Sequence, residues 1–406
     1  MNKTLVFIAV ILLIVVAVGN IIATHEYLTE QHPGHNDFMS RWEGARSFWR
    51  DGLNPYGERA SRNIQERIYG RAAGQDEDPG YFAYPFYTVF LVWPLVYVDY
   101  AWASAVWMVL LEACLIGAVI LLIDLYRWRV GPGMLTLLLF WTVLYYFAAR
   151  GLLLGQPSLL VYFLYVLVFW ALNKRSDVLA GMALALSTIK PQMGFLLVPF
   201  LLLCGLRFGR TTFVGSFVAL WGALMILSFA LQPTWFGDWI EQLRRYPSYT
   251  ALGAPVWIVM NYYLDLGTVG EWAVNLALYV VLLWGWYSVL AQRKVSRVDW
   301  AIMLTLTITN LAAIRTATPH YVVFNIPLFY YLRLLTQRDR RIGALWGLFI
   351  LSGLFILPWV HFLLTVKGEF EHPSVYLPLP FLMLLLLWFT RHHWWSAESL
   401  TGIGEV

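Results

Sequence analysis

Apolar stretches long enough to cross a lipid bilayer recur along this chain of 406 residues, beginning with the stretch from Leu5 to Ala23. A helix needs roughly 20 such residues to span the hydrocarbon core. Charged residues make up 13% of the chain, about half of the ~25% that is usual in soluble domains. The sequence therefore predicts an all-α polytopic membrane protein, with residues 1–406 forming a single integral-membrane domain.

The charge and the cysteines exclude several other classes of protein. The net charge of +4 is small, so the composition gives no sign of a nucleic-acid partner. Cys114 and Cys204 both lie inside apolar stretches, where no spacing typical of a disulfide or a metal site occurs. We expect no metal and no cofactor, and we expect a monomer surrounded by membrane lipids.

Basic residues between the apolar stretches predict the orientation, because Lys and Arg accumulate in short cytoplasmic loops. Clusters of this kind occur at Lys3, Arg127–Arg129, Lys174–Arg175, Arg207–Arg210, Arg293–Arg297, Arg338–Arg341 and Arg391. Assigning them all to the cytoplasm predicts about twelve spans, at 5–23, 101–125, 133–149, 157–172, 178–190, 191–206, 211–231, 271–291, 298–314, 320–335, 342–363 and 376–390. The short apolar stretch 84–98 leaves open whether a further span exists.

This orientation places a long first loop, residues 24–100, outside the cytoplasm. Phe38, Trp42, Ala45 and Trp49 recur there at spacings of three to four residues, which predicts a helix that lies in the membrane interface with its apolar face toward lipid. A second helix is expected over residues 61–73. Asp37 stands at the entrance of the first helix, and it is the carboxylate on which the functional interpretation depends.

Several other polar groups are predicted at the same outer face, where ionisable side chains near the membrane are costly and often functional. Arg150 and Gln156 bracket a short turn, Lys190 interrupts an apolar stretch, and Arg315 and His320 flank another turn. Cations close to one carboxylate suit an anionic phosphate substrate beside a base, because Arg binds phosphate with a bidentate fork and Lys as a point charge.

Each of these residues also has a purely structural interpretation. Asp37 can serve as the N-cap of the helix that follows it. Lys190 can extend to the interface, with its charge in water and its stem in lipid. Arg150 and Arg315 can hold span ends next to lipid headgroups, Gln156 can cap a turn, and His320 can be a satisfied polar residue between helices.

Four motifs in order resemble glycosyltransferase family 87, a group of integral-membrane transferases with the GT-C fold. They are Asp37-Phe38 with Ala45 and Gly52-Leu53-Asn54-Pro55-Tyr56; Phe82-Ala83-Tyr84-Pro85-Phe86; Leu154-Gly155-Gln156; and Ala180-Gly181 leading to Lys190-Pro191. Phe86 departs from the family pattern, in which a second proline is common at that position. The resemblance covers residues 5–210, and beyond them it is limited to hydropathy and the Pro319-His320-Tyr321 turn.

The resemblance implies an inverting glycosyltransferase on the outer face of the cytoplasmic membrane. Such enzymes move a sugar, mannose or arabinofuranose, from a polyprenyl-phosphate donor to a glycolipid or glycan. We favour mannose. Asp37 corresponds to the base and His320 to a late-loop histidine near the donor. We assign Lys190, Arg315, Arg150 and Gln156 to the donor phosphate, and Arg41, Tyr56 and Tyr84 to the acceptor side.

A secondary transporter or flippase of a lipid-linked sugar is the alternative function. Transporters commonly contain inverted repeats and broken helices at the middle of the membrane. No internal repeat is visible in this chain, and its notable charges are predicted at one face, which favours the enzyme.

Overall fold

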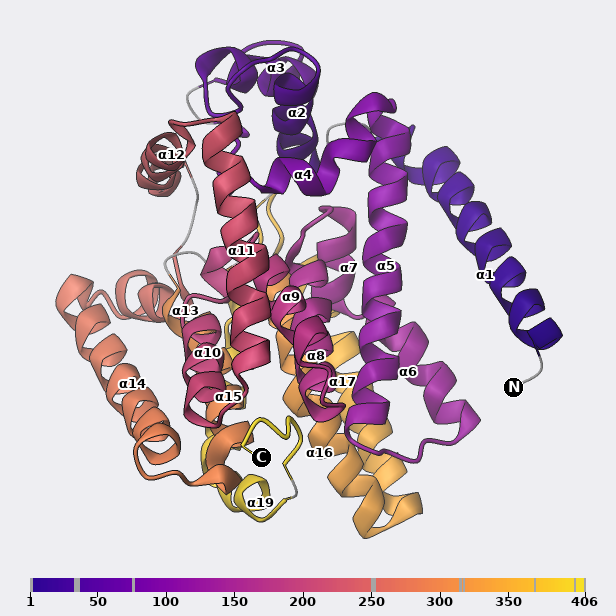
Figure 1. Cartoon of the computed structure of the whole chain (residues 1–406), viewed down its shortest axis with the longest axis vertical. Coiled ribbons are helices and arrows are strands. Elements are labelled where there is room, and N and C mark those ends of the chain that lie inside the picture. Colours follow the sequence, from indigo (N-terminus) through magenta and orange to yellow (C-terminus); the bar gives the residue numbers. More distant parts are fainter. Residues whose placement is uncertain are drawn as a thin grey trace. The chain divides into compact units, whose positions relative to one another are not determined.

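The computed structural model describes residues 3–32, 37–74, 77–249, 253–313, 316, 318–368, 370–397 and 399–404, and helices dominate it (Figure 1). Residues 367 and 370 form an isolated β-bridge, and no longer strand occurs within the described ranges. The chain divides into two compact units. Unit 1 comprises residues 1–114, 152–157 and 225–250, and unit 2 comprises residues 115–151, 158–224 and 251–406.

Unit 1 contains the amino-terminal helix and the helices of the predicted first outer loop. Its elements are α1 (Lys3–Thr24), the π-helix η1 (His25–Thr29), α2 (Phe38–Trp49), α3 (Glu58–Tyr69), α4 (Thr88–Val92), the 3-10 helix η2 (Trp93–Tyr97), the first part of α5 (Tyr100–Leu125), the end of α11 (Thr211–Leu231) and α12 (Trp235–Tyr249). Helix α2 packs against α3, α4 and η2 (Figure 1). The second loop helix predicted at 61–73 is confirmed as α3, shifted by a few residues.

The apolar face of α2 was predicted to face lipid, and this prediction is wrong. Phe38, Trp42 and Ala45 are all buried inside the protein. The Phe38 ring stacks on Trp107 with their centroids 4.9 Å apart, and the Trp42 indole N–H donates a 2.8 Å hydrogen bond to the main-chain oxygen of Leu95. The three-to-four-residue spacing identified the correct face, but that face forms part of the core of unit 1.

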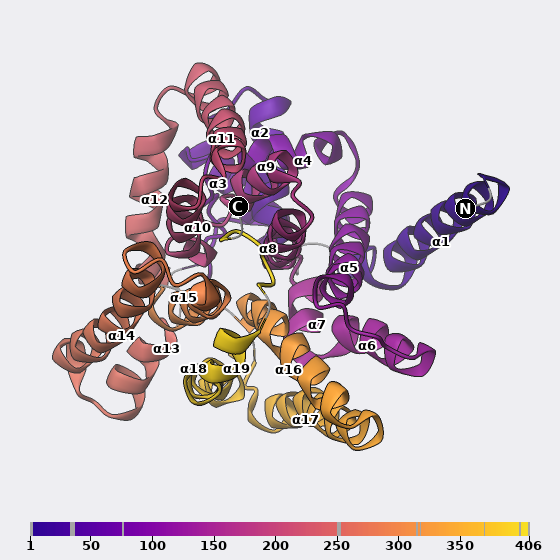
Figure 2. The same ribbon diagram turned by 60° about the horizontal axis from the view of Figure 1, so that its bottom comes forward.

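Besides the second part of α5 and the first part of α11, unit 2 contains the remaining helices. They are α6 (Pro132–Leu144), α7 (Tyr146–Leu153), α8 (Ser158–Asn173), α9 (Asp177–Ser187), η3 (Pro191–Met193), α10 (Leu197–Arg207), α13 (Pro255–Trp257), η4 (Ile258–Tyr263), α14 (Gly267–Leu290), η5 (Val295–Arg297), α15 (Val298–Ala312), η6 (Thr318–Phe324), α16 (Asn325–Arg338), α17 (Arg340–Thr365), η7 (Pro373–Val375), α18 (Pro378–Phe389) and α19 (Arg391–Ser396). Helices α8 and α9 pack together, as do α16 and α17. Figure 2 shows α16 beside α17, and α18 beside α19.

Five helices within the described ranges are long and apolar enough to cross a membrane, so this is a helical membrane protein. They comprise residues 7–29, 100–125, 211–231, 267–290 and 340–365, and α6 with α7, bent by 50°, can form a sixth span. In α1 the most apolar window has no buried residue, as expected for a helix in contact with lipid. The predicted count of about twelve spans is not confirmed.

The other predicted spans correspond to shorter helices. Helices α9 and α10 have 11 residues each, and α8 has 16. The stretch 84–98 contains only a short apolar helix over residues 88–97, which is not a candidate span. A helix of 11 residues covers about 16 Å at 1.5 Å per residue, well short of the ~30 Å hydrocarbon core. Short helices are tolerated at membrane depth where neighbouring protein rather than lipid surrounds them.

Candidate functional site

Asp37 occupies the N-cap position of α2, yet its side chain makes no capping hydrogen bond. Instead, the amide nitrogen Nε2 of Gln156 donates to Oδ2 of Asp37. The main-chain N–H of Asp37 donates to the main-chain oxygen of Leu154 at 2.6 Å. The capping interpretation of this residue is therefore wrong, and the carboxylate is oriented by the turn that contains Gln156.

The turn itself depends on Gly155. Its φ angle is +63°, a left-handed conformation that glycine adopts without steric cost. Its carbonyl oxygen accepts a 2.8 Å hydrogen bond from the Trp107 indole, which fixes the turn to α5 within unit 1. The Leu154-Gly155-Gln156 motif is therefore a rigid support for the Asp37 side chain.

Arg41 lies one helical turn after Asp37 and is almost fully buried, with 1% of its surface exposed. Its Nη1 donates a 2.6 Å hydrogen bond to the main-chain oxygen of Asp37, and its Nη2 donates to the hydroxyl of Tyr84. Nη2 also lies 3.5 Å from Oε1 of Gln156. The guanidinium carbon is 4.1 Å from the centre of the Tyr84 ring, in the range of a cation–π contact.

Tyr84 joins this group through its own contacts. Its main-chain oxygen accepts a 2.6 Å hydrogen bond from the hydroxyl of Tyr56. Burial raises the pKa of Tyr84, and the positive charge of Arg41 opposes that shift. The Tyr84 hydroxyl therefore stays protonated near neutral pH, and it can donate a hydrogen bond to a substrate while it accepts one from Arg41.

Glycine at position 44 brings α2 close to the segment that carries Tyr84. A Cβ atom added to Gly44 would lie 2.5 Å from Cδ2 of the buried Phe82 ring. This distance is below van der Waals contact, so any larger residue would push the two segments apart. Gly44 therefore helps to hold Tyr84 against Arg41.

Asp238 of α12 also contributes to unit 1, and the sequence analysis did not identify it. Its Oδ2 accepts a 2.8 Å hydrogen bond from Nδ2 of Asn54. The side-chain oxygen of Asn54 in turn accepts a 3.0 Å hydrogen bond from the main-chain N–H of Tyr56. Nothing in the sequence pattern around Asp238 links it to the Gly52–Tyr56 motif, because only folding brings these residues together.

Lys190 and His320 form a second cluster, which lies in unit 2. Both are buried, each with 3% of its surface exposed. The ammonium Nζ of Lys190 donates a 2.7 Å hydrogen bond to Oγ of Ser158. Lys190 therefore does not extend to the interface, and that structural interpretation is wrong.

The charge of Lys190 influences the protonation of His320. Residues 318–324 form a 3-10 helix outside the candidate spans. Burial lowers the pKa of His320, and the neighbouring positive charge of Lys190 lowers it further. His320 is therefore a neutral imidazole at physiological pH, able to donate or accept a hydrogen bond but not to act as a cation.

Arg150 belongs to a third group in unit 2, centred on Glu371. Its Nη2 lies 3.9 Å from Oε2 of Glu371, and its guanidinium faces the Phe362 ring at 5.2 Å. The hydroxyls of Tyr146 and Thr318 donate to Oε1 of Glu371 at 2.6 and 2.7 Å. Glu371 was not among the predicted site residues, although its position between the predicted spans 342–363 and 376–390 was a signal.

The structure thus places most of the predicted site residues in three groups. Five belong to unit 1, two to the Lys190 group of unit 2, and one to the Glu371 group: Asp37, Arg41, Tyr56, Tyr84 and Gln156; Lys190 and His320; and Arg150. Arg315 lies outside the described residues. Within the described ranges, no three His, Cys, Asp or Glu side chains form a group that could hold a metal ion.

The described helices and polar groups define a helical membrane protein with clustered buried charges. The chain matches the family model described as Glycosyltransferase family 87 over residues 82–312, more than half of its length. It belongs to glycosyltransferase family 87 and is therefore a glycosyltransferase, which confirms the family predicted from the motifs. No curated protein and no solved structure matches the chain.

The matched range contains three of the four motifs on which the resemblance was based. It includes residues 82–86, 154–156 and 180–191, and it extends beyond residue 210, where the resemblance was limited to hydropathy. Asp37 precedes the matched range, so its role must be argued from its own contacts.

Proposed function

We propose that the protein is an inverting glycosyltransferase that moves a sugar, with mannose favoured, from a polyprenyl-phosphate donor to a hydroxyl of a glycolipid or glycan. The proposed reaction takes place at the outer face of the cytoplasmic membrane. One observation carries the proposal. Asp37 stands at a helix start, where its carboxylate would normally cap the helix, but it accepts a hydrogen bond from Gln156 beside the buried Arg41 instead.

Asp37 acts as the general base in this proposal. Its Oδ2 is oriented by Gln156, and Oδ1 is the oxygen that receives the acceptor proton. The hydrogen bond from Arg41 goes to the main-chain oxygen of Asp37 and not to its carboxylate. Proton transfer of this kind typically accelerates a reaction by about 10²–10⁴-fold.

The reaction balances as a single displacement. The acceptor oxygen forms a bond to the anomeric carbon while the bond from that carbon to the phosphate oxygen breaks, with inversion of configuration. The proton of the acceptor hydroxyl moves to Asp37, and polyprenyl phosphate leaves as an anion. No oxidant, reductant or further substrate is needed.

Lys190 stabilises the departing phosphate in this proposal. Buried cations placed where negative charge develops are among the largest contributions to catalysis. His320, neutral beside Lys190, contributes a hydrogen bond rather than charge. Arg315 remains a proposed phosphate ligand, and Arg150 a weaker one because Glu371 offsets part of its charge.

Each cluster receives one hydrogen bond from or to a residue of the segment 156–158. Gln156 hydrogen bonds to Asp37, and Ser158 hydrogen bonds to Lys190. Only Pro157 separates Gln156 from Ser158 in the sequence. We propose that Arg41, Tyr56 and Tyr84, which contact one another in unit 1, lie on the acceptor side.

The experiment that tests this function replaces Asp37 by asparagine. Asparagine keeps the shape of the side chain and can accept the hydrogen bond from Gln156, but it is not a base. Purified enzyme is incubated with polyprenyl-phosphate-mannose and candidate glycolipids, and the products are measured by mass spectrometry. We expect a loss of at least about 100-fold without a change in melting temperature.

The matched control is Asp51→Asn, just beyond the other end of α2, where the carboxylate is exposed and lies 3.5 Å from Arg46. This variant should keep full activity. Release of free mannose from the donor by water provides a readout that does not depend on the acceptor chosen. Retention of transfer by Asp37→Asn would show that Asp37 is not the base.

A further inference from the structure

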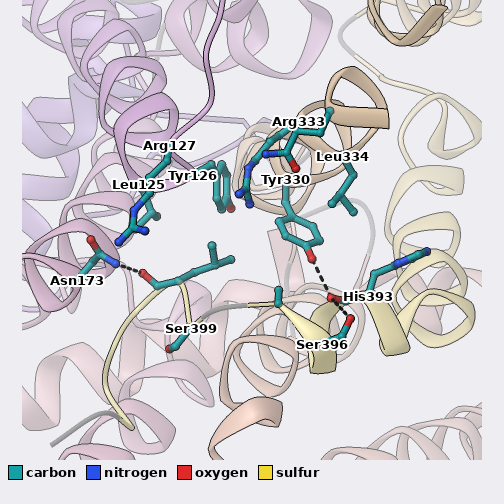
Figure 3. A pocket seen from close by; sticks show the side chains of 13 residues that line it. Leu125, Tyr126, Arg127, Asn173, Tyr330, Arg333, Leu334, His393, Ser396 and Ser399 are labelled. Carbon is teal, nitrogen blue, oxygen red and sulfur yellow. Dashed lines mark hydrogen bonds between the residues drawn. The ribbon is translucent and has the colours of Figure 1, made fainter. Parts of the chain in front are cut away.

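A basic pocket lies in unit 2, formed by two adjoining cavities that share Arg127 and Gln337. The first has a volume of about 350 Å³ and the second about 630 Å³, within the range of roughly 300–1,000 Å³ that is usual for small-molecule sites. Figure 3 shows the first cavity, between the loop after α5, helix α16 and the carboxy-terminal segment. It shares no residue with the Asp37, Lys190 or Glu371 groups.

The charge of the pocket is of one sign. Arg127 and Arg333 line the first cavity together with His393, and Arg129 and Arg340 line the second. Among the described residues that line the two cavities, none is Asp or Glu. Like charges that lie close together repel each other, and a bound anion relieves that repulsion.

Three carboxylates close to the pocket have partners of their own, and Asp124 also interacts electrostatically with Arg127. Asp124 is paired with Lys174 at 2.8 Å, and Asp299 accepts hydrogen bonds from the main-chain N–H groups of Leu400 and Thr401. Asp339 caps α17, accepting from two main-chain N–H groups of its first turn. None of the three lines either cavity.

Arg333 carries a buried hydrogen-bond donor that the described residues do not satisfy. Its Nε atom is shielded from solvent and has no hydrogen-bond partner among them. Buried polar atoms are normally paired with protein, water or a ligand, so this donor is available to an oxygen acceptor in the pocket. Figure 3 shows the Arg333 side chain extending from α16 toward Tyr126.

The walls of the pocket are held in place by hydrogen bonds. The hydroxyl of Tyr126 donates to the main-chain oxygen of Ile326 at 2.6 Å, and the indole of Trp128 donates to Oγ1 of Thr336 at 2.8 Å. Both bonds join the loop after α5 to α16. The arginines are thus presented by a preorganised frame, which reduces the entropy lost when a ligand binds.

We propose that this basic pocket binds a phosphate group, and that the group belongs to the headgroup of an anionic membrane lipid. Guanidinium groups recognise phosphate oxygens through paired N–H donors. Basic pockets between helices at a membrane surface are typical sites for anionic headgroups. The pocket lies at span ends, because Arg127 and Arg129 follow the candidate span 100–125 and Arg340 begins the candidate span 340–365.

The test uses the full chain, purified in detergent and freed of lipid. Thermal unfolding is followed during titration with phosphatidylglycerol, with zwitterionic phosphatidylcholine and with inorganic phosphate. A ligand that binds only the folded state raises the melting temperature in a saturable way. We expect this rise with phosphatidylglycerol and neither with phosphatidylcholine nor with inorganic phosphate.

Arg333→Gln should raise the half-saturating concentration of phosphatidylglycerol at least tenfold, as loss of one charge-assisted contact predicts. Arg333→Lys, which keeps the charge but not the paired donors, should show a smaller loss. Arg338→Gln is the matched control, because Arg338 is in the last turn of the same helix, exposed, and lines neither cavity. It should bind like the unmodified protein.

Arg127→Gln provides an independent variant in case Arg333→Gln does not fold, because Arg127 lies exposed in the loop after α5. Unchanged titrations in both glutamine variants would overturn the proposal. A saturable response to inorganic phosphate that is lost in these variants would support a phosphate site and refute the lipid as its source. A response to phosphatidylcholine equal to that of phosphatidylglycerol would overturn the proposal.

Discussion

Replacement of Lys190 by methionine tests whether the buried cation contacts the donor phosphate. Methionine keeps an unbranched side chain of similar length and removes only the ammonium group. Lys190 is 3% exposed, and its Nζ donates a 2.7 Å hydrogen bond to Ser158. A hydrogen bond to a charged group contributes about 1.5–3 kcal/mol, so kcat/KM for the polyprenyl-phosphate donor should fall by roughly 10- to 150-fold.

The stability of the same variant separates a catalytic role from a structural one. Removal of a charge from a buried position is often neutral or stabilising when the replacement packs well. We therefore expect the melting temperature to stay constant or to rise while kcat/KM falls. A structural role for Lys190 predicts the opposite pattern, with a lower melting temperature and an unchanged kcat/KM.

His320 provides a second readout in Lys190→Met. Burial lowers the pKa of His320 and the charge of Lys190 lowers it further, so removal of that charge should raise the pKa toward its ordinary value. Titration of isotopically labelled histidine by NMR measures the change. Lys174→Met is the control, since Lys174 is exposed and paired with Asp124. A kcat/KM within twofold of the unmodified enzyme would refute the proposed role of Lys190.

Three further predictions follow from the described contacts. Gln156→Leu leaves the carboxylate of Asp37, the proposed base, in place but without the hydrogen bond that orients it, so kcat should fall about tenfold or more with little change in donor KM or melting temperature; a lower melting temperature with unchanged kcat would indicate a structural role. Because the folded pKa of His320 lies below about 6.5, the unfolded state binds more protons and stability falls as the pH drops below that value. The slope of the unfolding free energy with pH, measured between pH 5 and 7, should fall by up to about 1.4 kcal/mol per pH unit in His320→Asn. An unchanged slope would contradict the lowered pKa of His320. Cysteines replacing the exposed Arg62 and Lys367 should react with an impermeant reagent from outside, and one replacing Lys174 should not; the reverse would invert the proposed orientation.

The sequence predicted both the class of the protein and its family correctly. Hydropathy indicated the class, and short motifs indicated the family. The thickness of the bilayer fixes the length of an apolar span, so recurring apolar stretches indicate a membrane protein before any contact is known. The short motifs at residues 82–86, 154–156 and 180–191 indicated the glycosyltransferase family, and the family match covers all three. They also identified Tyr84 and Gln156, which contact the same arginine.

The number of spans could not be obtained in the same way. Hydropathy measures how apolar a segment is, but it reveals neither where a helix ends nor whether protein or lipid covers it. Helices α9 and α10, too short to be candidate spans, therefore read as spans in the sequence. The same ambiguity explains α2, whose periodicity identified the apolar face but not the protein core that covers it.

The roles of the charged residues were decided by the tertiary structure alone. Whether Asp37 caps its own helix or accepts a hydrogen bond from Gln156 depends on a turn more than 100 positions away in the sequence. From the sequence, Arg150 was predicted to bind phosphate with its full charge, but the fold brings Glu371 to within 3.9 Å of it. Sequence determines which side chains can carry charge, and only the fold determines which charges meet, because electrostatic interactions depend on distance in space and on burial from water.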